Sequence, residues 1–217
     1  MVPMKTVAIY NKKGGAGRTT LAAHLAFRAE AQGISTVAVS LDRQGDLMSW
    51  LTRERRPQDA PHVEHREHLT IIHSPGSVPE VPDAALAVYD LPSTPEVALL
   101  VKPDLWLIPL GDSRIQIELL AQYLPELAGS GASILIVPWA VKLRREQIFS
   151  TVRDVVGRFP NVTLSDHAVP ESLAITRAND GLRSVWDSPP EADSPGAQEL
   201  ARLCDSIIAL LGLVTVY

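Results

Sequence analysis

Short apolar segments alternate along this chain with longer segments in which apolar residues recur every three or four positions. The apolar segments are residues 4–10, 36–41, 69–73, 85–91, 104–110 and 133–138. Their length and β-branched content predict buried strands. The amphipathic segments are residues 18–32, 114–128, 146–158 and 196–212. Their spacing predicts helices that bury one face, and the alternation as a whole predicts an α/β fold.

The predicted strands are apolar on both faces and are joined through helices. This arrangement favours a parallel sheet with helices on both faces, in which ligands bind at the carboxyl ends of the strands. Residues 52–68 are polar and residues 187–196 contain several prolines, so both are predicted to be irregular surface connections. We expect a single domain that spans residues 1–217.

Composition excludes several classes of protein. With 46% hydrophobic and 21% charged residues, the chain resembles globular proteins rather than disordered or fibrous ones. Its net charge of −5 means that contact with nucleic acid requires a local basic patch. The single cysteine, Cys204, cannot form an internal disulfide. No apolar run approaches the roughly 20 residues of a membrane span, so we expect a cytoplasmic protein without a membrane partner.

The strongest motif is the segment NKKGGAGRTT, residues 11–20, which lies between a predicted strand and a predicted helix. Glycines allow backbone N–H groups to surround phosphate oxygens, and the following helix presents its positive end to the same anion. Thr19 stands where a P-loop places the hydroxyl ligand of Mg²⁺. The expected nucleotide-binding residues of this loop are Lys13, Gly14, Gly15, Ala16, Gly17, Arg18, Thr19 and Thr20.

The loop departs from the plain P-loop pattern at two positions, because Lys12 replaces its first glycine and Arg18 replaces its lysine. In this form it resembles the deviant Walker A motif of the ParA/MinD family of P-loop ATPases, K-G-G-x-G-K-[ST]. The resemblance implies an ATP- and Mg²⁺-binding P-loop NTPase domain. It also implies that Lys13 is the signature lysine, which reaches the partner subunit's nucleotide in a homodimer formed with ATP.

Two carboxylates extend the resemblance to the ParA/MinD family. Residues 39–45, VSLDRQG, are similar to the D-x-D-P-Q-G motif, with Ser40 in place of the first aspartate and Arg43 in place of the proline. The resemblance places Asp42 beside the attacking water and Mg²⁺. Residues 88–93, VYDLPS, look like the Walker B region, so Asp90 is expected to contact Mg²⁺ through water. The metal set is therefore Thr19, Asp42 and Asp90.

Similarity to the family continues through the second half of the chain. Residues 103–109 resemble its A-D-L-v-i-i-P-v strand, and residues 168–172, AVPES, resemble the I-P-x-S segment near the adenine. Pro170 is thus expected to contact the nucleotide.

Arg18 bears on the catalytic prediction, in which Lys13, Arg18 and Asp42 act together. A lysine in this position is a compact cation that follows the charge of the transferred phosphate, whereas an arginine is longer, planar and forked, and need not fit the same crevice. A misplacement of about 1 Å can cost roughly 10²-fold in rate. The sequence therefore predicts ATP binding with slow hydrolysis, that is, a weak Mg²⁺-dependent ATPase.

A local basic segment covers residues 138–158 in a chain that is otherwise acidic. Its Lys142, Arg144, Arg145 and Arg153 are the candidate contacts for nonspecific DNA, and Trp139 is the one tryptophan that we would test for such a contact. The alternative is a solvated helix face. His62, His65 and His68 favour a polar loop over a zinc site.

Three functions remain open at this stage. The resemblance favours a partition or cargo-positioning ATPase with an activating partner, either ParB-like or a cargo adaptor, and nucleoid association would follow from DNA binding. Arg18 and Ser40 favour a hydrolysis-impaired nucleotide-binding scaffold that gates a partner protein. A metabolic enzyme on the same fold is the third, although Cys204 alone argues against an iron–sulfur cluster bridged by paired cysteines.

Overall fold

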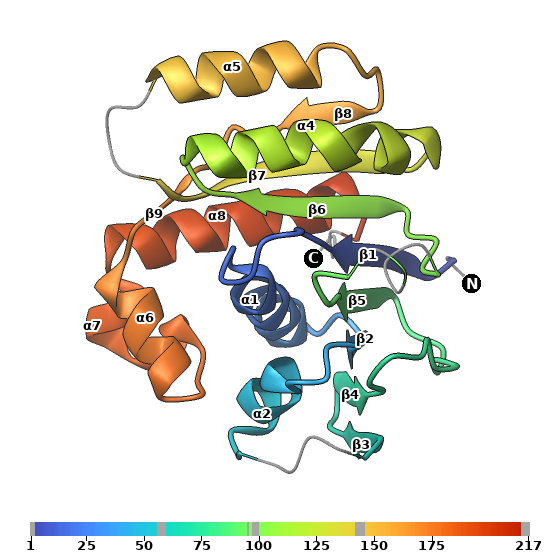
Figure 1. Cartoon of the computed structure of the whole chain (residues 1–217). Coiled ribbons are helices and arrows are strands. Elements are labelled where there is room, and N and C mark those ends of the chain that lie inside the picture. The colour runs from blue at the N-terminus through green and yellow to red at the C-terminus, as the bar shows by residue number, and fades with distance from the viewer. Residues whose placement is uncertain (1–2, 56–59, 95, 97–99, 142–145, 214–217) are drawn as a thin grey trace.

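A central β-sheet organises the molecule. The computed structural model describes residues 3–55, 60–94, 96, 100–141 and 146–213. The strands are β1 (Lys5–Ile9), β2 (Thr36–Ser40), β3 (His62–His65), β4 (Leu69–His73), β5 (Leu86–Asp90), β6 (Leu105–Leu110), β7 (Ser133–Val141), β8 (Val162–Leu164) and β9 (Val169–Pro170). Their order is β3-β4-β2-β5-β1-β6-β7-β8, and β9 pairs with β7 (Figure 1). Of these pairs, only β3–β4 is antiparallel within the described ranges.

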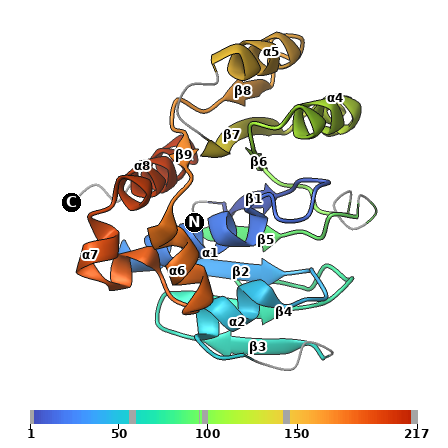
Figure 2. The same ribbon diagram turned by 60° about the vertical axis from the view of Figure 1, so that its left-hand side comes forward.

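Helices cover both faces of the sheet. On one face lie α1 (Arg18–Ala31), α2 (Asp46–Thr52), α6 (Leu173–Asp180) and α8 (Pro195–Leu210), and on the other lie α4 (Arg114–Gly129) and α5 (Glu146–Val156) (Figure 2). Strand β1 contributes to both layers, because Val7 and Ile9 pack on the α1 side, while Ala8, and Tyr10 just after the strand, pack on the α4 side. The predicted α/β fold with helices on both faces is confirmed.

The two segments predicted to be irregular contain regular structure, and in this respect the prediction was wrong. Within residues 52–68, β3 forms a hairpin with β4 and adds an antiparallel edge to the sheet. Its residues are mostly exposed, so the hydrophobic pattern gave no signal. Within residues 187–196 lie the end of a 3₁₀ turn (Val185–Asp187), α7 (Pro189–Ala192) and the start of α8. Their prolines occupy first turns of helices, where a missing N–H costs little.

The carboxyl ends of β1, β2 and β5 meet at one edge of the sheet. Asp90, the last residue of β5, is in register with Ile9 of β1 on one side and with Ser40 of β2 on the other. The backbone continues this pairing one residue further, since the Leu41 N–H donates to the Asp90 carbonyl. The residues that follow these three strands are therefore held close together.

Candidate functional site

The loop between β1 and α1 is shaped by two glycines with positive φ. Gly15 has φ 70° and Gly17 has φ 90°, backbone conformations that residues other than glycine rarely adopt. Gly17 also occupies the N-cap position of α1. Asn11 fixes the start of the loop, because its Oδ1 accepts from the Lys13 N–H and its Nδ2 donates to the Pro109 carbonyl. The exposed residues 12–15 thus surround the positive end of a helix.

Arg18 folds beneath this loop. Its Nη1 donates to the carbonyl oxygens of Asn11, at 2.7 Å, and Lys13, at 3.0 Å. Its Nη2 lies 3.7 Å from Oδ2 of Asp42, and only 10% of the side chain is exposed. The forked side chain therefore fits inside the loop, in which it binds carbonyl groups of the loop itself.

Thr19 and Asp90 form the polar centre of the site. The Thr19 hydroxyl donates to Oδ2 of Asp90 at 2.8 Å, while Oδ1 of Asp90 is buried without a partner among the described residues. Burial raises the pKa of Asp90 to about 7, against the lowering influence of the Thr19 hydrogen bond and of Arg18. A hydroxyl and a carboxylate with a spare oxygen make a hard donor set that fits Mg²⁺.

Asp42 lies at the start of the loop that follows β2. Its Oδ1 accepts from the Gln44 N–H at 3.1 Å, and its other oxygen faces Arg18. Asp46, one helical turn away, has a raised pKa because of its burial and of the nearby Asp42 charge. Ser40 is fully buried, and its hydroxyl has no partner in the described structure.

A cavity of about 410 Å³ opens in front of the loop, a size typical of small-molecule sites. The loop contributes residues 15–20 to its lining. The opposite wall comes from β7, β9 and α6, and includes Trp139, Pro170, Ser172 and Asn179. Pro170, predicted from its motif, thus lies in the same cavity as the loop.

Trp139 is a wall residue that the sequence analysis missed. A Cβ on Gly17 would lie 2.2 Å from its Nε1, so the indole ring packs directly on the loop backbone. The residue is only 8% exposed, so in this structure its indole faces the loop and the cavity, and a DNA contact stays a prediction to be tested. The neighbouring Ala140 has φ 52°, at an irregularity where β7 pairs with β9. Nothing in the local sequence signals this pairing.

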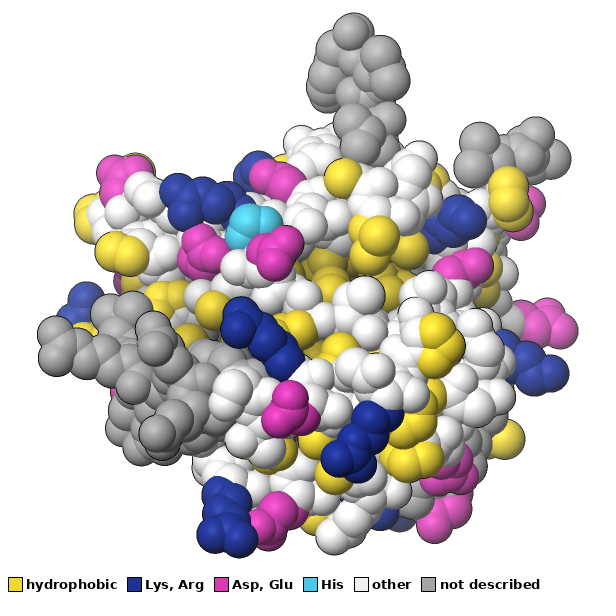
Figure 3. Space-filling view, turned by 90° about the horizontal axis from the view of Figure 1, so that it is seen from above, with side chains coloured by type: hydrophobic (Ala, Val, Ile, Leu, Met, Phe, Trp, Pro, Cys, Tyr) yellow, Lys and Arg dark blue, Asp and Glu magenta, His cyan; other side chains and the backbone are white. Residues whose placement is uncertain are grey.

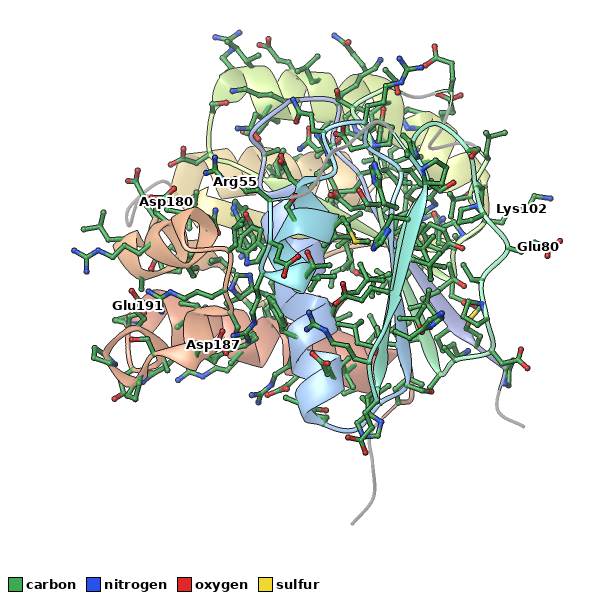
Figure 4. All side chains as sticks on the ribbon, turned by 90° about the horizontal axis from the view of Figure 1, so that it is seen from below. Arg55, Glu80, Lys102, Asp180, Asp187 and Glu191 are labelled. Atoms are coloured by element: carbon green, nitrogen blue, oxygen red, sulfur yellow. The ribbon has the colours of Figure 1, made fainter. Side chains whose placement is uncertain are left out.

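A second cavity, of about 480 Å³, continues from the first between α2 and α6. The two share Thr19, Thr20, Asp46 and Asn179. Arg55 and Asp180 also line this second cavity. Figure 4 shows the two residues in the same region of the molecule. Asn179 joins both cavities to α1 through a 3.4 Å hydrogen bond from its Nδ2 to the Thr20 hydroxyl.

The candidate DNA-binding residues are only partly visible. Lys142, Arg144 and Arg145 lie outside the described residues, whereas Arg153 is exposed on α5 beside the acidic Asp154. On the molecular face that carries α4 and α5, basic and acidic side chains are interspersed (Figure 3). The described residues contain no cluster of three or more His, Cys, Asp or Glu side chains suited to a metal ion. In the same part of the chain, no helix has the length and hydrophobicity of a membrane span.

A known family model matches most of the chain. Residues 7–213 match the family model described as the CobQ/CobB/MinD/ParA nucleotide binding domain. No curated protein sequence matches the chain. Among solved structures, the Cyanothece McdA(D38A)–ATP complex is 16% identical, with a TM-score of 0.72 and coverage of 99% of this chain and 98% of that one.

Two further structures share this fold. MinD of Pyrococcus horikoshii OT3, complexed with Mg-ADP, is 17% identical, with a TM-score of 0.72 and coverage of 99% of this chain and 100% of that one. A protein of Borrelia burgdorferi B31 described as a plasmid partition protein, bound to AMPPNP, is 14% identical, with a TM-score of 0.71 and coverage of 96% and 100%.

Proposed function

Because the chain belongs to the CobQ/CobB/MinD/ParA nucleotide-binding family, we propose that it is an ATP-switched protein that positions a plasmid, a chromosome region or another cargo. In this proposal it binds ATP with Mg²⁺ in the 410 Å³ cavity, dimerises in the ATP-bound state, and hydrolyses ATP slowly. The Mg-ADP, ATP and AMPPNP complexes of the structural neighbours support the choice of ligand.

The observation that carries the proposal is the Thr19–Asp90 hydrogen bond at the foot of the glycine loop. It joins a hydroxyl at a helix N-terminus to a buried carboxylate whose second oxygen has no partner in the described structure. Thr19, Asp90 and Asp42 are the residues that would hold Mg²⁺. When bound, Mg²⁺ would neutralise charge on the phosphate oxygens.

Residues of the chain itself bind the nucleotide, orient the attacking water and contact the second subunit. Backbone N–H groups of residues 13–20 bind the phosphates, and Pro170 contacts the nucleotide from the opposite wall. Asp42 orients the attacking water, while the exposed Lys13 reaches the nucleotide of the second subunit. Arg18 slows turnover because its Nη1 is anchored to two loop carbonyls, so the guanidinium cannot move with the phosphate as the bond to the leaving group breaks.

Two partners complete the proposal. Nonspecific DNA would be bound through Arg153 and its basic neighbours in sequence, and would place the protein on the nucleoid. An activating partner, ParB-like or a cargo adaptor, would raise the slow hydrolysis. The neighbour described as a plasmid partition protein supports this assignment by analogy of fold.

A second function is a nucleotide-binding scaffold that gates a partner without hydrolysis. The buried Arg18 and the unpartnered Ser40 hydroxyl favour it, because neither provides a group that activates water. Both functions require nucleotide binding, and they differ in turnover.

The deciding experiment measures dimerisation and ATP hydrolysis with and without nonspecific DNA. ATP-dependent dimers with DNA-stimulated turnover support the positioning ATPase, whereas ATP-dependent dimers without turnover support the scaffold. Lys13→Gln should abolish the ATP dimer while monomers retain nucleotide, and Lys12→Gln is the matched control on the same exposed loop. Absence of saturable uptake of Mg-ATP by folded protein would refute both functions.

A further inference from the structure

The Arg18 guanidinium is only partly engaged. Of its hydrogen-bonding groups, Nη1 binds two loop carbonyls, and Nη2 makes a loose ion pair with Asp42 at 3.7 Å, beyond hydrogen-bond distance. Its Nε–H is buried and has no partner in the described residues. A buried donor that lacks an acceptor is destabilising, so a ligand oxygen that accepts from this N–H would be bound favourably.

The unused donors lie on one edge of the planar group. Nε and Nη2 form the parallel fork with which arginine binds two oxygens of a phosphate or carboxylate. Because Nη1 is anchored to the loop at Asn11 and Lys13, the orientation of that edge is fixed. The edge is therefore preorganised, and its present occupant, Asp42, satisfies only part of it.

We propose that Arg18 distinguishes nucleoside triphosphates from diphosphates by exchanging Asp42 for the terminal phosphate. This inference rests on the proposed nucleotide binding. With a diphosphate bound or with no ligand, Asp42 stays paired with Arg18. A terminal phosphate takes the Nε–Nη2 edge with two hydrogen bonds and displaces the Asp42 carboxylate.

The displaced carboxylate has space to move into. Asp42 is 24% exposed and lines another hollow, of about 580 Å³, with Gly14 and Gln44. Gln44 also lines the 410 Å³ cavity, so a carboxylate that turns into this hollow stays next to the nucleotide site. The ion pair thus acts as a latch: Asp42 becomes free to orient water only when a triphosphate occupies the site. A lysine cannot replace this device, because one ammonium group cannot bind two loop carbonyls and also present a fork.

The test compares the dissociation constants of Mg-ADP and of a non-hydrolysable Mg-ATP analogue for four proteins: wild type, Asp42→Asn, Arg18→Lys and the double variant. Asp42→Asn should change the ratio of the two dissociation constants about 3- to 10-fold in favour of the analogue, because the analogue no longer has an ion pair to break, whereas any loss of Mg²⁺ binding affects both nucleotides. In the Arg18→Lys background the same change should have less than half of this effect on a logarithmic scale. Arg114→Lys, at an exposed position on α4, is the control for arginine substitution.

The double variant separates the latch from simple repulsion between Asp42 and the terminal phosphate. Repulsion acts in both backgrounds, so an Asp42→Asn effect of equal size in the two would overturn the inference while nucleotide binding stands. Equal changes in ADP and analogue affinity would also overturn it. If neither nucleotide binds to folded wild type, the proposed function and the latch both fail.

A measurement on the unaltered chain guards against misfolded variants. The Nε–H signal of Arg18 in a ¹⁵N-labelled sample can be identified by its loss in Arg18→Lys. It should shift when the Mg-ATP analogue is added and stay in place with Mg-ADP. A signal that responds equally to both nucleotides would contradict the exchange.

Discussion

The two ends of helix α1 use an arginine in opposite ways. At its beginning, Arg18 is buried with an unpaired Nε and a 3.7 Å ion pair. Near its end, Arg28 binds Asp205 with two hydrogen bonds of 2.7 Å and lies over the ring of Trp186. The Asp205 hydrogen bond is the main reason why the pKa of Arg28 is raised.

The contrast separates a functional end from a structural end. Near Arg28 the Asp205 carboxylate is fully used, because Arg28 donates two hydrogen bonds to it and Gln32 donates a third. Near Arg18, the buried groups without a partner among the described residues include Nε itself, Oδ1 of Asp90 and the Ser40 hydroxyl. Buried polar groups are normally paired, so a cluster of unpaired ones at a helix N-terminus indicates where a ligand belongs. Substitutions along α1 test this distinction.

Gly17→Ala should lower nucleotide affinity by about 10³-fold. The φ of 90° costs an alanine about 1–2 kcal/mol and the contact with Trp139 adds about 1–3 kcal/mol of overpacking, so the loop would leave the conformation that binds phosphate. Gly33→Ala is the control at the other end of α1, where φ is 70° but the space is open. It should cost about 1 kcal/mol of stability and leave affinity unchanged. Calorimetric titration and chemical unfolding measure the two effects, and equal affinities for both variants would contradict the distinction.

His24, in the middle of α1, should make the protein less stable in acid. Burial, opposed by its hydrogen bond to the Thr20 carbonyl and by the Asp187 charge, lowers the pKa of His24 to about 4. Its Nε2 accepts from the Val185 N–H, so the neutral ring is required. The unfolded chain, with a histidine pKa near 6.5, takes up the proton first as pH falls. Stability should therefore drop between about pH 6.5 and 4, by up to about 3 kcal/mol.

Urea unfolding across this pH range measures the effect, with His24→Gln as the comparison because an amide does not titrate. The variant should be less stable at pH 7 and should lose the part of the slope that belongs to His24. An unchanged slope would show that other groups cause the acid sensitivity.

Arg18→Lys should raise ATP turnover about 10-fold, since a lysine released from the loop carbonyls follows the charge of the transferred phosphate. Steady-state phosphate release, measured at saturating Mg-ATP, reports the change. A lower rate in the variant would mean that arginine is adapted to the reaction.

Arg28→Ala should have the smallest effect, about 1 kcal/mol of stability, because both members of its ion pair are partly exposed. Nucleotide affinity and turnover should not change. Any loss of affinity comparable to that of Gly17→Ala would show that the two ends of the helix are coupled, and the distinction between them would fail.

Local sequence was sufficient for one side of the site. The loop, Thr19 and the carboxylates Asp42 and Asp90 come from short motifs at strand ends, and a parallel sheet brings such ends together. The opposite wall could not be predicted in the same way. Trp139 packs on Gly17 from the irregular end of β7, where that strand pairs with β9, and Asn179 of α6 hydrogen-bonds the Thr20 hydroxyl of α1. These are long-range contacts without a local signature.

The sequence pattern also did not predict the antiparallel edge strand β3 or the hydrogen bonds that Arg18 makes within the loop. Strand β3 is short and exposed, so alternation does not reveal it. The hydrogen bonds from Arg18 to two loop carbonyls depend on the path of the backbone, which residue types alone do not specify.

The packing of Trp139 against Gly17 gives the molecule a built-in optical reporter. An indole touching the phosphate loop senses any change in its surroundings, whereas Trp106 is sealed in the layer beneath α4. Intrinsic emission is thus expected to follow occupation of the loop without any attached dye, and a Trp139→Phe chain, which keeps Trp50, Trp106 and Trp186, supplies the reference for the response of the other tryptophans.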